Sequence, residues 1–296
     1  MLSIGASRRP IYSGRGPLKS YLLSSHQNSG MTLRKNKLRE RLRKGEPTIG
    51  THIQCSWPTI VEIVGQAGSF HYVEFTSTYG PYDLYALENL GRAAELCDLT
   101  AMIKVDADPK VFVAQRAVGS GFQSILFADL RSIEEVEEAI RAVRAEPEGW
   151  NGCSMERADR ILEGGTRSFV KYCDDVVVAI MVEKRSLYDK LEDLMNLEGV
   201  DMVQFGPCDF AMSNSLHTQY SHPTIVEAER RIIKTALKYD KHPRVELGGS
   251  QPAFEKSLKK YMSLGVRDFS VGQDTVILQN WWSDFGRLTA KTLGTQ

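Results

Sequence analysis

Short apolar segments alternate with longer segments of helical periodicity from Thr48 almost to the end of the chain. Several short segments are apolar nearly throughout, which is typical of parallel strands buried on both faces. We therefore predict eight strands, at residues 48–54, 71–75, 100–105, 124–127, 176–182, 201–205, 244–248 and 267–272. The longer segments have the apolar spacing of amphipathic helices. The predicted helices span residues 58–68, 84–97, 109–121, 132–146, 186–199, 222–241, 251–265 and 274–294.

Eight strand–helix units in about 250 residues match the count and the length of a (β/α)₈ TIM barrel. The competing architecture is a doubly wound open sheet. That fold usually carries a glycine-rich dinucleotide-binding turn after an early strand, and this sequence has no such turn there. The pattern therefore predicts an α/β protein made of a single (β/α)₈ barrel.

The first thirty residues differ in composition from the rest of the chain. They are rich in serine and arginine and contain no acidic residue. Such a segment cannot bury much apolar surface, so we predict a disordered extension at residues 1–30 and a barrel domain at residues 31–296. The same composition is typical of an organelle transit peptide. Another interpretation is that translation starts at Met31, which opens a further predicted helix at residues 31–45. Without import, a cytoplasmic location is expected.

Charge and cysteine content narrow the function classes. The chain has 37 basic and 37 acidic residues, so no net charge attracts it to nucleic acid or to an anionic membrane. No apolar run approaches the length of a membrane span. The five cysteines are scattered and form no CxxC pair, which indicates free thiols rather than a disulfide framework or a zinc site.

Two carboxylates follow neighbouring predicted strands. Glu183 ends the fifth strand, and Asp209 comes just after the sixth, in the stretch MVQFGPCDFAMS. Catalytic groups of barrels lie at the carboxyl ends of the strands, and adjacent strands are about 4.8 Å apart. The two carboxylates could therefore share one hard cation such as Mg²⁺ or Mn²⁺. Each one alone is also consistent with a helix cap or with an ion pair, for example between Glu183 and Lys184.

The motifs of this region resemble those of a known family. The segment VEKRSLYDKLEDLMNLEGVDMVQFGPCDFAMS, at residues 182–213, resembles the HpcH/HpaI aldolase/citrate lyase family in its strand-end glutamate and in its GVD and GPxD turns. The segments at residues 50–75 and 265–278 are similar to the first and last parts of that family's barrel. The resemblance extends over nearly all of residues 33–293.

The resemblance implies a metal-dependent barrel that handles pyruvate as its enolate. Glu183 and Asp209 match the family's ligands for Mg²⁺, Mn²⁺ or Co²⁺. The turn at Gly206, Cys208 and Asp209 matches the segment whose backbone N–H groups bind the carboxylate of a 2-oxo acid, and exposed N–H groups at a helix start suit that task. The expected partners are a small 2-oxo acid and an aldehyde, and the family's exchange of helices between subunits implies a homo-oligomer.

The sequence departs from the family pattern where protons are transferred. After the second strand the family has Asp-x-Glu-His, whereas Glu74 stands here at the aspartate and Ser77 at the histidine. Lys104 stands near the family's arginine after the third strand. We therefore predict that Lys104 offsets charge on the enolate oxygen and that Glu74 either takes the proton directly or orients a metal-bound water. The alternative is that Glu74 only pairs with Lys104 across adjacent strand ends. His52, in the first strand, points either into the barrel mouth or onto a packed face.

The leading functional hypothesis is a metal-dependent carbon–carbon lyase, a class II type aldolase that cleaves or forms a 2-oxo acid through a pyruvate enolate. One alternative is an oxaloacetate-type decarboxylase or an acyl-lyase, since replacement of the histidine favours chemistry with less proton transfer. Another is a barrel that binds a ligand without catalysis. Schiff-base chemistry at Lys104 is disfavoured because it leaves Glu183 and Asp209 without a role.

Overall fold

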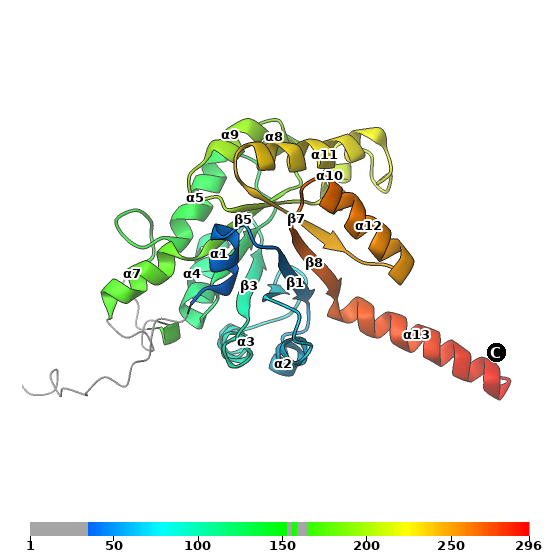
Figure 1. Ribbon diagram of the computed structural model, residues 1–296. Helices are drawn as coiled ribbons and strands as arrows, with labels where there is room; N and C mark the ends of the chain where they lie inside the picture. Colours follow the sequence, from blue (N-terminus) through cyan, green and yellow to red (C-terminus); the bar gives the residue numbers. More distant parts are fainter. Residues whose placement is uncertain (1–34, 153–155, 159–164, 296) are drawn as a thin grey trace, which may run out of the picture. The chain divides into compact units, whose positions relative to one another are not determined.

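The eight predicted strands form a closed barrel. In the computed structural model, which describes residues 35–152, 156–158 and 165–295, β1 to β8 are parallel and follow one another in sequence order around the barrel. The strand β1 pairs with both β2 and β8, which closes the sheet. The prediction of a (β/α)₈ barrel is therefore confirmed (Figure 1). The extension predicted at residues 1–30 lies outside the described residues.

Each strand lies within two residues of its predicted bounds. Apolar side chains on both faces set these limits, because a parallel strand covered by helices has no solvent face. The strands are β1 (Thr48–Ile53), β2 (Tyr72–Thr76), β3 (Thr100–Val105), β4 (Ser124–Phe127), β5 (Val177–Val182), β6 (Met202–Phe205), β7 (His242–Leu247) and β8 (Asp268–Gln273).

The helices follow the predicted order with three differences. The segment predicted as one helix at residues 186–199 forms two short helices, α8 and α9, which meet at Lys190 (φ −105°, ψ 26°). Two helices, α7 and α10, were not predicted. The described helices are α1 (Lys37–Arg43), α2 (Pro58–Gln66), α3 (Leu84–Leu96), α4 (Lys110–Ser120), α5 (Ile133–Val143), α7 (Thr166–Asp174), α8 (Arg185–Tyr188), α9 (Leu191–Asn196), α10 (Pro207–Ser213), α11 (Pro223–Lys238), α12 (Gln251–Ser263) and α13 (Asp274–Leu293).

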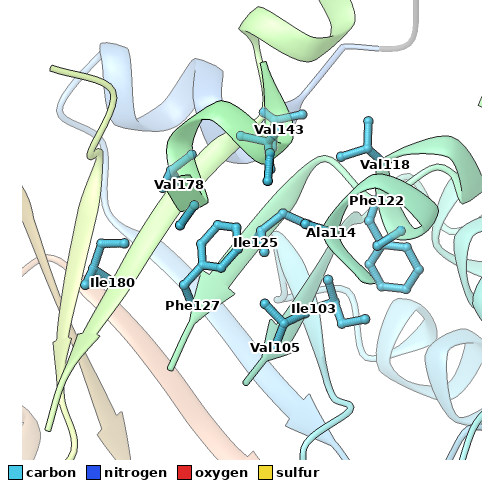
Figure 2. Packing of buried hydrophobic residues seen from close by; sticks show 14 of the residues in the cluster. Ile103, Val105, Ala114, Val118, Phe122, Ile125, Phe127, Val143, Val178 and Ile180 are labelled. Atoms are coloured by element: carbon cyan, nitrogen blue, oxygen red, sulfur yellow. The ribbon is translucent and has the colours of Figure 1, made fainter. Parts of the chain in front are cut away.

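A large apolar cluster fills the space between the barrel wall and its helices. Ile103 of β3 and Ile125 of β4 face Val118 of α4 there, with Phe122 and Phe127 packed beside them (Figure 2). All five side chains are at most 1% exposed. Full burial of one such side chain stabilises a fold by about 1.5–3 kcal/mol, so this layer holds the strand ends in register.

The amino-terminal half of the barrel interior is apolar and is closed by α1. Leu38 and Leu42 of α1 are buried in one cluster with Met102 of β3 and Met202 of β6. The side chain of Asn36 caps α1 by accepting a hydrogen bond from the Arg39 N–H. The helix therefore acts as a plug at the end of the barrel opposite the carboxyl ends of the strands.

The middle of the interior depends on a close approach of β1 to β2. A Cβ atom at Gly50 would lie 2.2 Å from two ring carbons of Tyr72, so only glycine leaves room for this inward tyrosine. Beyond Tyr72, toward the carboxyl ends of the strands, inward positions include the polar and charged side chains of Glu74, Lys104 and Gln204. The barrel interior therefore changes from apolar to polar at this level.

The last helix, α13, begins directly after β8 and extends away from the barrel (Figure 1). It exposes to solvent the large apolar side chains of Val276, Ile277, Leu278, Trp281, Trp282, Phe285, Leu288 and Leu293. Trp281 and Trp282 are 58% and 62% exposed, and Trp281 stacks on Phe285 with the ring centroids 4.7 Å apart. Among the helices of the described ranges, none combines the length and the apolar character that a membrane crossing requires.

Candidate active site

A cavity of about 210 Å³ opens at the carboxyl ends of the strands and contains every site residue predicted from the sequence. Side chains alternate between the interior and the outside along a strand, so strand-end residues of one parity meet at the mouth. The predicted residues that line the cavity are Glu74, Lys104, Glu183, Gly206, Cys208 and Asp209. His52 lines it too, so of the two orientations considered for this histidine, the structure has the one facing the mouth.

Glu183 lies at the end of β5, and its side chain is fixed by two contacts. One oxygen, Oε1, accepts a hydrogen bond from the Asp129 N–H at 2.7 Å. The other, Oε2, faces Gly206, where an added Cβ would lie only 2.5 Å away. Burial raises the pKa of Glu183, and the positive charge of Lys104 opposes that shift. Gly206 is therefore the residue that allows the strand-end carboxylate to lie against the next turn.

Asp209 lies in the first turn of α10, which begins at Pro207. Its side chain is 39% exposed and its Oδ1 accepts a hydrogen bond from the Lys184 Nζ at 2.9 Å. The same ammonium also pairs with Asp129. Burial lowers the pKa of Lys184, but the hydrogen bonds with the two aspartates outweigh this and raise it. The lysine that follows Glu183 is therefore a charged partner of Asp209.

The two carboxylates can supply part of the coordination shell of a divalent cation. Glu183 and Asp209 come from neighbouring strand ends and face the same cavity, and carboxylate oxygens suit hard cations. In the described part of the chain, no three His, Cys, Asp or Glu side chains form a group that could hold a metal. The protein would thus supply two ligands, Glu183 and Asp209. The cation would either displace the Lys184 ammonium from Asp209 or bind the other carboxylate oxygen of Asp209.

Glu74 lies deeper in the mouth, and its partner was not foreseen. It forms an ion pair with Arg244 of β7, and the two side chains are 1% and 0% exposed. The Arg244 guanidinium also donates to the Tyr72 hydroxyl at 2.8 Å and to the side-chain oxygen Oε1 of Gln204. Gln204 in turn donates to Glu246 at 2.7 Å. The network forms the floor of the cavity.

Lys104 projects from β3 into the same cavity and is 7% exposed. Its Nζ lies 3.4 Å from the Tyr79 hydroxyl and 5.0 Å from the centre of the Tyr79 ring. Burial lowers the pKa of Lys104, but Tyr79, Glu183 and Glu74 together raise it, so the amine is a cation. Ser77, at the position of the family's histidine, donates instead to the Lys104 backbone carbonyl at 2.6 Å.

Counting positions along the strands could have predicted that three of these residues face the interior. Arg244 and Glu246 have the same parity on β7, and Gln204 lies two residues before Gly206. Because Glu183 and Glu74 face inward, the register of the sheet brings these residues to the same interior. The pairing of Lys184 with Asp129 has no such signal, because it depends on the path of two loops.

A closed parallel barrel with charged side chains gathered at its carboxyl mouth defines a barrel enzyme of the TIM class. The sequence profile of the HpcH/HpaI aldolase/citrate lyase family matches residues 83–241. The chain belongs to this family of carbon–carbon lyases.

Known relatives agree with that assignment. The chain is 28% identical over 250 residues to a pyruvate aldolase of Rhizobium etli, a match that covers 84% of this chain and 95% of the relative. It is 23% identical over 245 residues to a 5-keto-4-deoxy-D-glucarate aldolase of Klebsiella pneumoniae, covering 83% and 93%. The crystal structure of an HpcH/HpaI aldolase from Desulfitobacterium hafniense superposes with a TM-score of 0.77 at 18% identity, covering 86% and 97%. This last likeness concerns the fold.

Proposed function

We propose that the protein is a metal-dependent aldolase that cleaves or forms a 2-oxo acid through a pyruvate enolate. The observation that carries the proposal is the meeting, in one cavity, of the carboxylates Glu183 and Asp209 with the buried ammonium of Lys104. A carboxylate pair can hold a cation, and a separate fixed positive charge can face the oxygen on which negative charge develops. Relatives that are named as aldolases of pyruvate and of a keto-deoxy sugar acid support this substrate class.

Glu183 and Asp209 would hold the divalent cation. Glu183 is positioned by the Asp129 N–H and by Gly206, so it needs no rearrangement to present its free lone pairs. Asp209 is held in the first turn of α10 and keeps one oxygen outside its bond to Lys184. A bound cation of this kind would supply Lewis-acid charge for the 2-oxo group of the substrate.

The other proposed contacts follow from position. The turn from Gly206 to Asp209 lines the cavity beside Glu183, and the family resemblance assigns its backbone N–H groups to the substrate carboxylate. Lys104 would offset charge on the enolate oxygen as a point charge. Glu74 was predicted as the base, and it lines the cavity, but its carboxylate is buried in the ion pair with Arg244.

A second enzymatic candidate is decarboxylation of an oxaloacetate-type 2-oxo acid. The observation that favours it is the contact of Ser77, which directs its hydroxyl to a backbone carbonyl at the place where family aldolases carry their histidine. Loss of carbon dioxide forms the enolate directly, so it does not require a group that removes a hydroxyl proton.

The experiment is metal-dependent pyruvate release from a panel of 4-hydroxy-2-oxo acids and oxaloacetate. We expect chelator treatment to abolish activity and Mg²⁺, Mn²⁺ or Co²⁺ to restore it. Glu183→Gln and Asp209→Asn should each lower kcat/KM by about 10³-fold, a typical effect of removing one electrostatic group from a catalytic site. Glu227→Gln, which changes an exposed acid on α11, is the control and should keep full activity. Release of pyruvate that persists in chelator in both site variants would refute the metal-dependent mechanism.

A further inference from the structure

Ser77 and Glu74, the two candidates nearest to the family's acid/base position, are both engaged elsewhere. The Ser77 hydroxyl donates to the Lys104 carbonyl at 2.6 Å and so ties the β2–α3 loop to β3. Glu74 is fully buried and balances the charge of Arg244. If Glu74 took up a proton, Arg244 would remain as a buried cation without its counter-ion, and such an uncompensated charge is costly. Neither residue is well suited to carry a substrate proton.

Tyr79 occupies the opening of the same cavity. Its side chain is 62% exposed, and its hydroxyl lies 3.4 Å from the Lys104 Nζ. Gly80 fixes the turn that follows, because a Cβ atom there would lie 2.3 Å from the Gln54 carbonyl oxygen of the neighbouring loop. The phenol is therefore held beside a buried ammonium, at a place that substrate can reach.

Two neighbouring residues, Tyr82 and Thr76, favour Tyr79 as the group that contacts the substrate. Tyr82, in the same loop, packs its ring edge-on against Phe75 with centroids 5.7 Å apart. Thr76, which is level with Lys104 in the sheet, lines the cavity, and its buried hydroxyl has no hydrogen-bond partner among the described residues. A polar ligand atom near Thr76 would satisfy this hydroxyl and would lie in the part of the cavity that Lys104 and Tyr79 share.

We infer that Tyr79, with the ammonium of Lys104 beside it, is the acid/base that transfers the proton during carbon–carbon bond cleavage and formation. The inference rests on the proposed aldolase function. In cleavage, the phenolate oxygen takes the proton of the C4 hydroxyl while the C3–C4 bond breaks. The bonding electrons move to the 2-oxo group to give the enolate, and the aldehyde leaves. The phenol then returns the same proton to C3, which gives pyruvate and restores the phenolate.

The role of Lys104 follows from distance. At 3.4 Å, a fixed ammonium would stabilise the negative charge that the Tyr79 oxygen carries before the first proton transfer and again after the second, while between them the negative charge lies on the enolate oxygen. Lys104 is held by its own surroundings, since Glu74 and Glu183 face it from β2 and from the end of β5 and Asp106 follows it after β3. Lys104 can thus serve both the phenolate and the enolate oxygen from one position.

The test compares Tyr79→Phe with Tyr82→Phe in the full chain with Mg²⁺. The first assay is cleavage of the 4-hydroxy-2-oxo acid that the wild type turns over fastest. The second is exchange of the C3 protons of pyruvate in D₂O, followed by NMR. Tyr79→Phe should lower kcat for cleavage by about 10²–10⁴-fold, as expected for loss of a general acid/base, with KM changed less than about threefold. Tyr82→Phe should stay within about twofold of the wild type in both assays.

Three further results separate the explanations. Tyr79→Phe should decarboxylate oxaloacetate within about tenfold of the wild-type rate, because that step removes no hydroxyl proton. If Tyr79→Phe cleaves the aldol substrate within about threefold of the wild type, Tyr79 is not the acid/base, while the aldolase function stands. If the wild type neither cleaves the panel nor exchanges pyruvate protons, the proposed function fails and the inference fails with it.

Discussion

Replacing Arg244 by methionine tests whether the charged floor of the cavity is essential to the fold. Arg244 is fully buried and donates to three groups, Glu74, Tyr72 and Gln204. Burial lowers the pKa of Arg244, but the charges of Glu74 and Glu246 and the contact with Tyr72 together outweigh this and raise it, so the guanidinium is charged. Methionine fills a similar space but offers no donor. The variant therefore leaves a buried carboxylate and two polar side chains without their partner.

The expected loss of stability is large on the scale of a domain. Removing one member of a buried ion pair costs about 3–5 kcal/mol, because the remaining charge has no compensation. Both side chains are at most 1% exposed, so solvent does not screen the pair. Folded domains are stable by about 5–15 kcal/mol, so Arg244→Met should remove at least about a fifth of the free energy of unfolding.

Urea unfolding followed by circular dichroism measures this loss, with the slope m expected to stay constant while the midpoint falls. The matched control is Arg92→Met, because Arg92 forms an ion pair with Glu88 on the surface of α3, where the two side chains are 45% and 38% exposed. That change should cost less than about 0.5 kcal/mol. The double variant Glu74→Gln, Arg244→Met should be more stable than Arg244→Met alone, since the uncompensated carboxylate is gone.

A loss of less than about 1 kcal/mol in Arg244→Met would refute the reasoning. It would mean that Glu74 is neutral in the folded protein or that water reaches the cavity floor. A double variant less stable than the single one would also contradict it, because the cost would then come from lost packing rather than from an unpaired charge.

Three further predictions concern the carboxylates and the last helix. Gly206→Ala should displace the Glu183 carboxylate, which lies 2.5 Å from the added Cβ, and should lower kcat/KM at least about tenfold with an unchanged circular dichroism spectrum; full activity would contradict the close approach. Lys184→Met should tighten Mn²⁺ binding measured by calorimetry, because it removes a competing cation from Asp209; weaker binding would contradict the competition. The exposed apolar face of α13 should hold a homo-oligomer together, so light scattering at micromolar concentration should give a mass above that of one chain, and a monomer would contradict this.

The sequence predicts the barrel well because its strands are buried on two sides. In apolar runs such as residues 176–182, the change from apolar to polar residues marks where the buried strand begins and ends. The bounds of β5 lie within one residue of this run. The short helix α10 was missed because seven residues with a proline at the first position give little periodic signal. The helix predicted at residues 186–199 was wrong as one element, since apolar spacing does not show the bend at Lys190.

The candidate site was predictable wherever a residue ends a strand. Glu183 and Asp209 follow buried strands, and their meeting in one cavity follows from strand order alone. The partner of Glu74 was not predicted, because an arginine in a half-apolar strand such as β7 is usually assigned to the surface. Strand parity alone indicates that Arg244 could face inward, but its contacts with Tyr72 and Gln204 involve two other strands, which no local pattern contains.

The plug formed by α1 has a consequence for the order of folding. The helix precedes every strand in the chain, yet Arg39 binds the carbonyl oxygens of Asp175 and Val176 and the carboxylate of Asp201, which lie between 136 and 162 residues later. Contacts of such long sequence separation form late, because the intervening chain must first be ordered. A fragment that ends before Asp201 therefore lacks the carboxylate that fixes α1. During synthesis, α1 can therefore close the amino-terminal end of the barrel only after most of the strands have emerged from the ribosome.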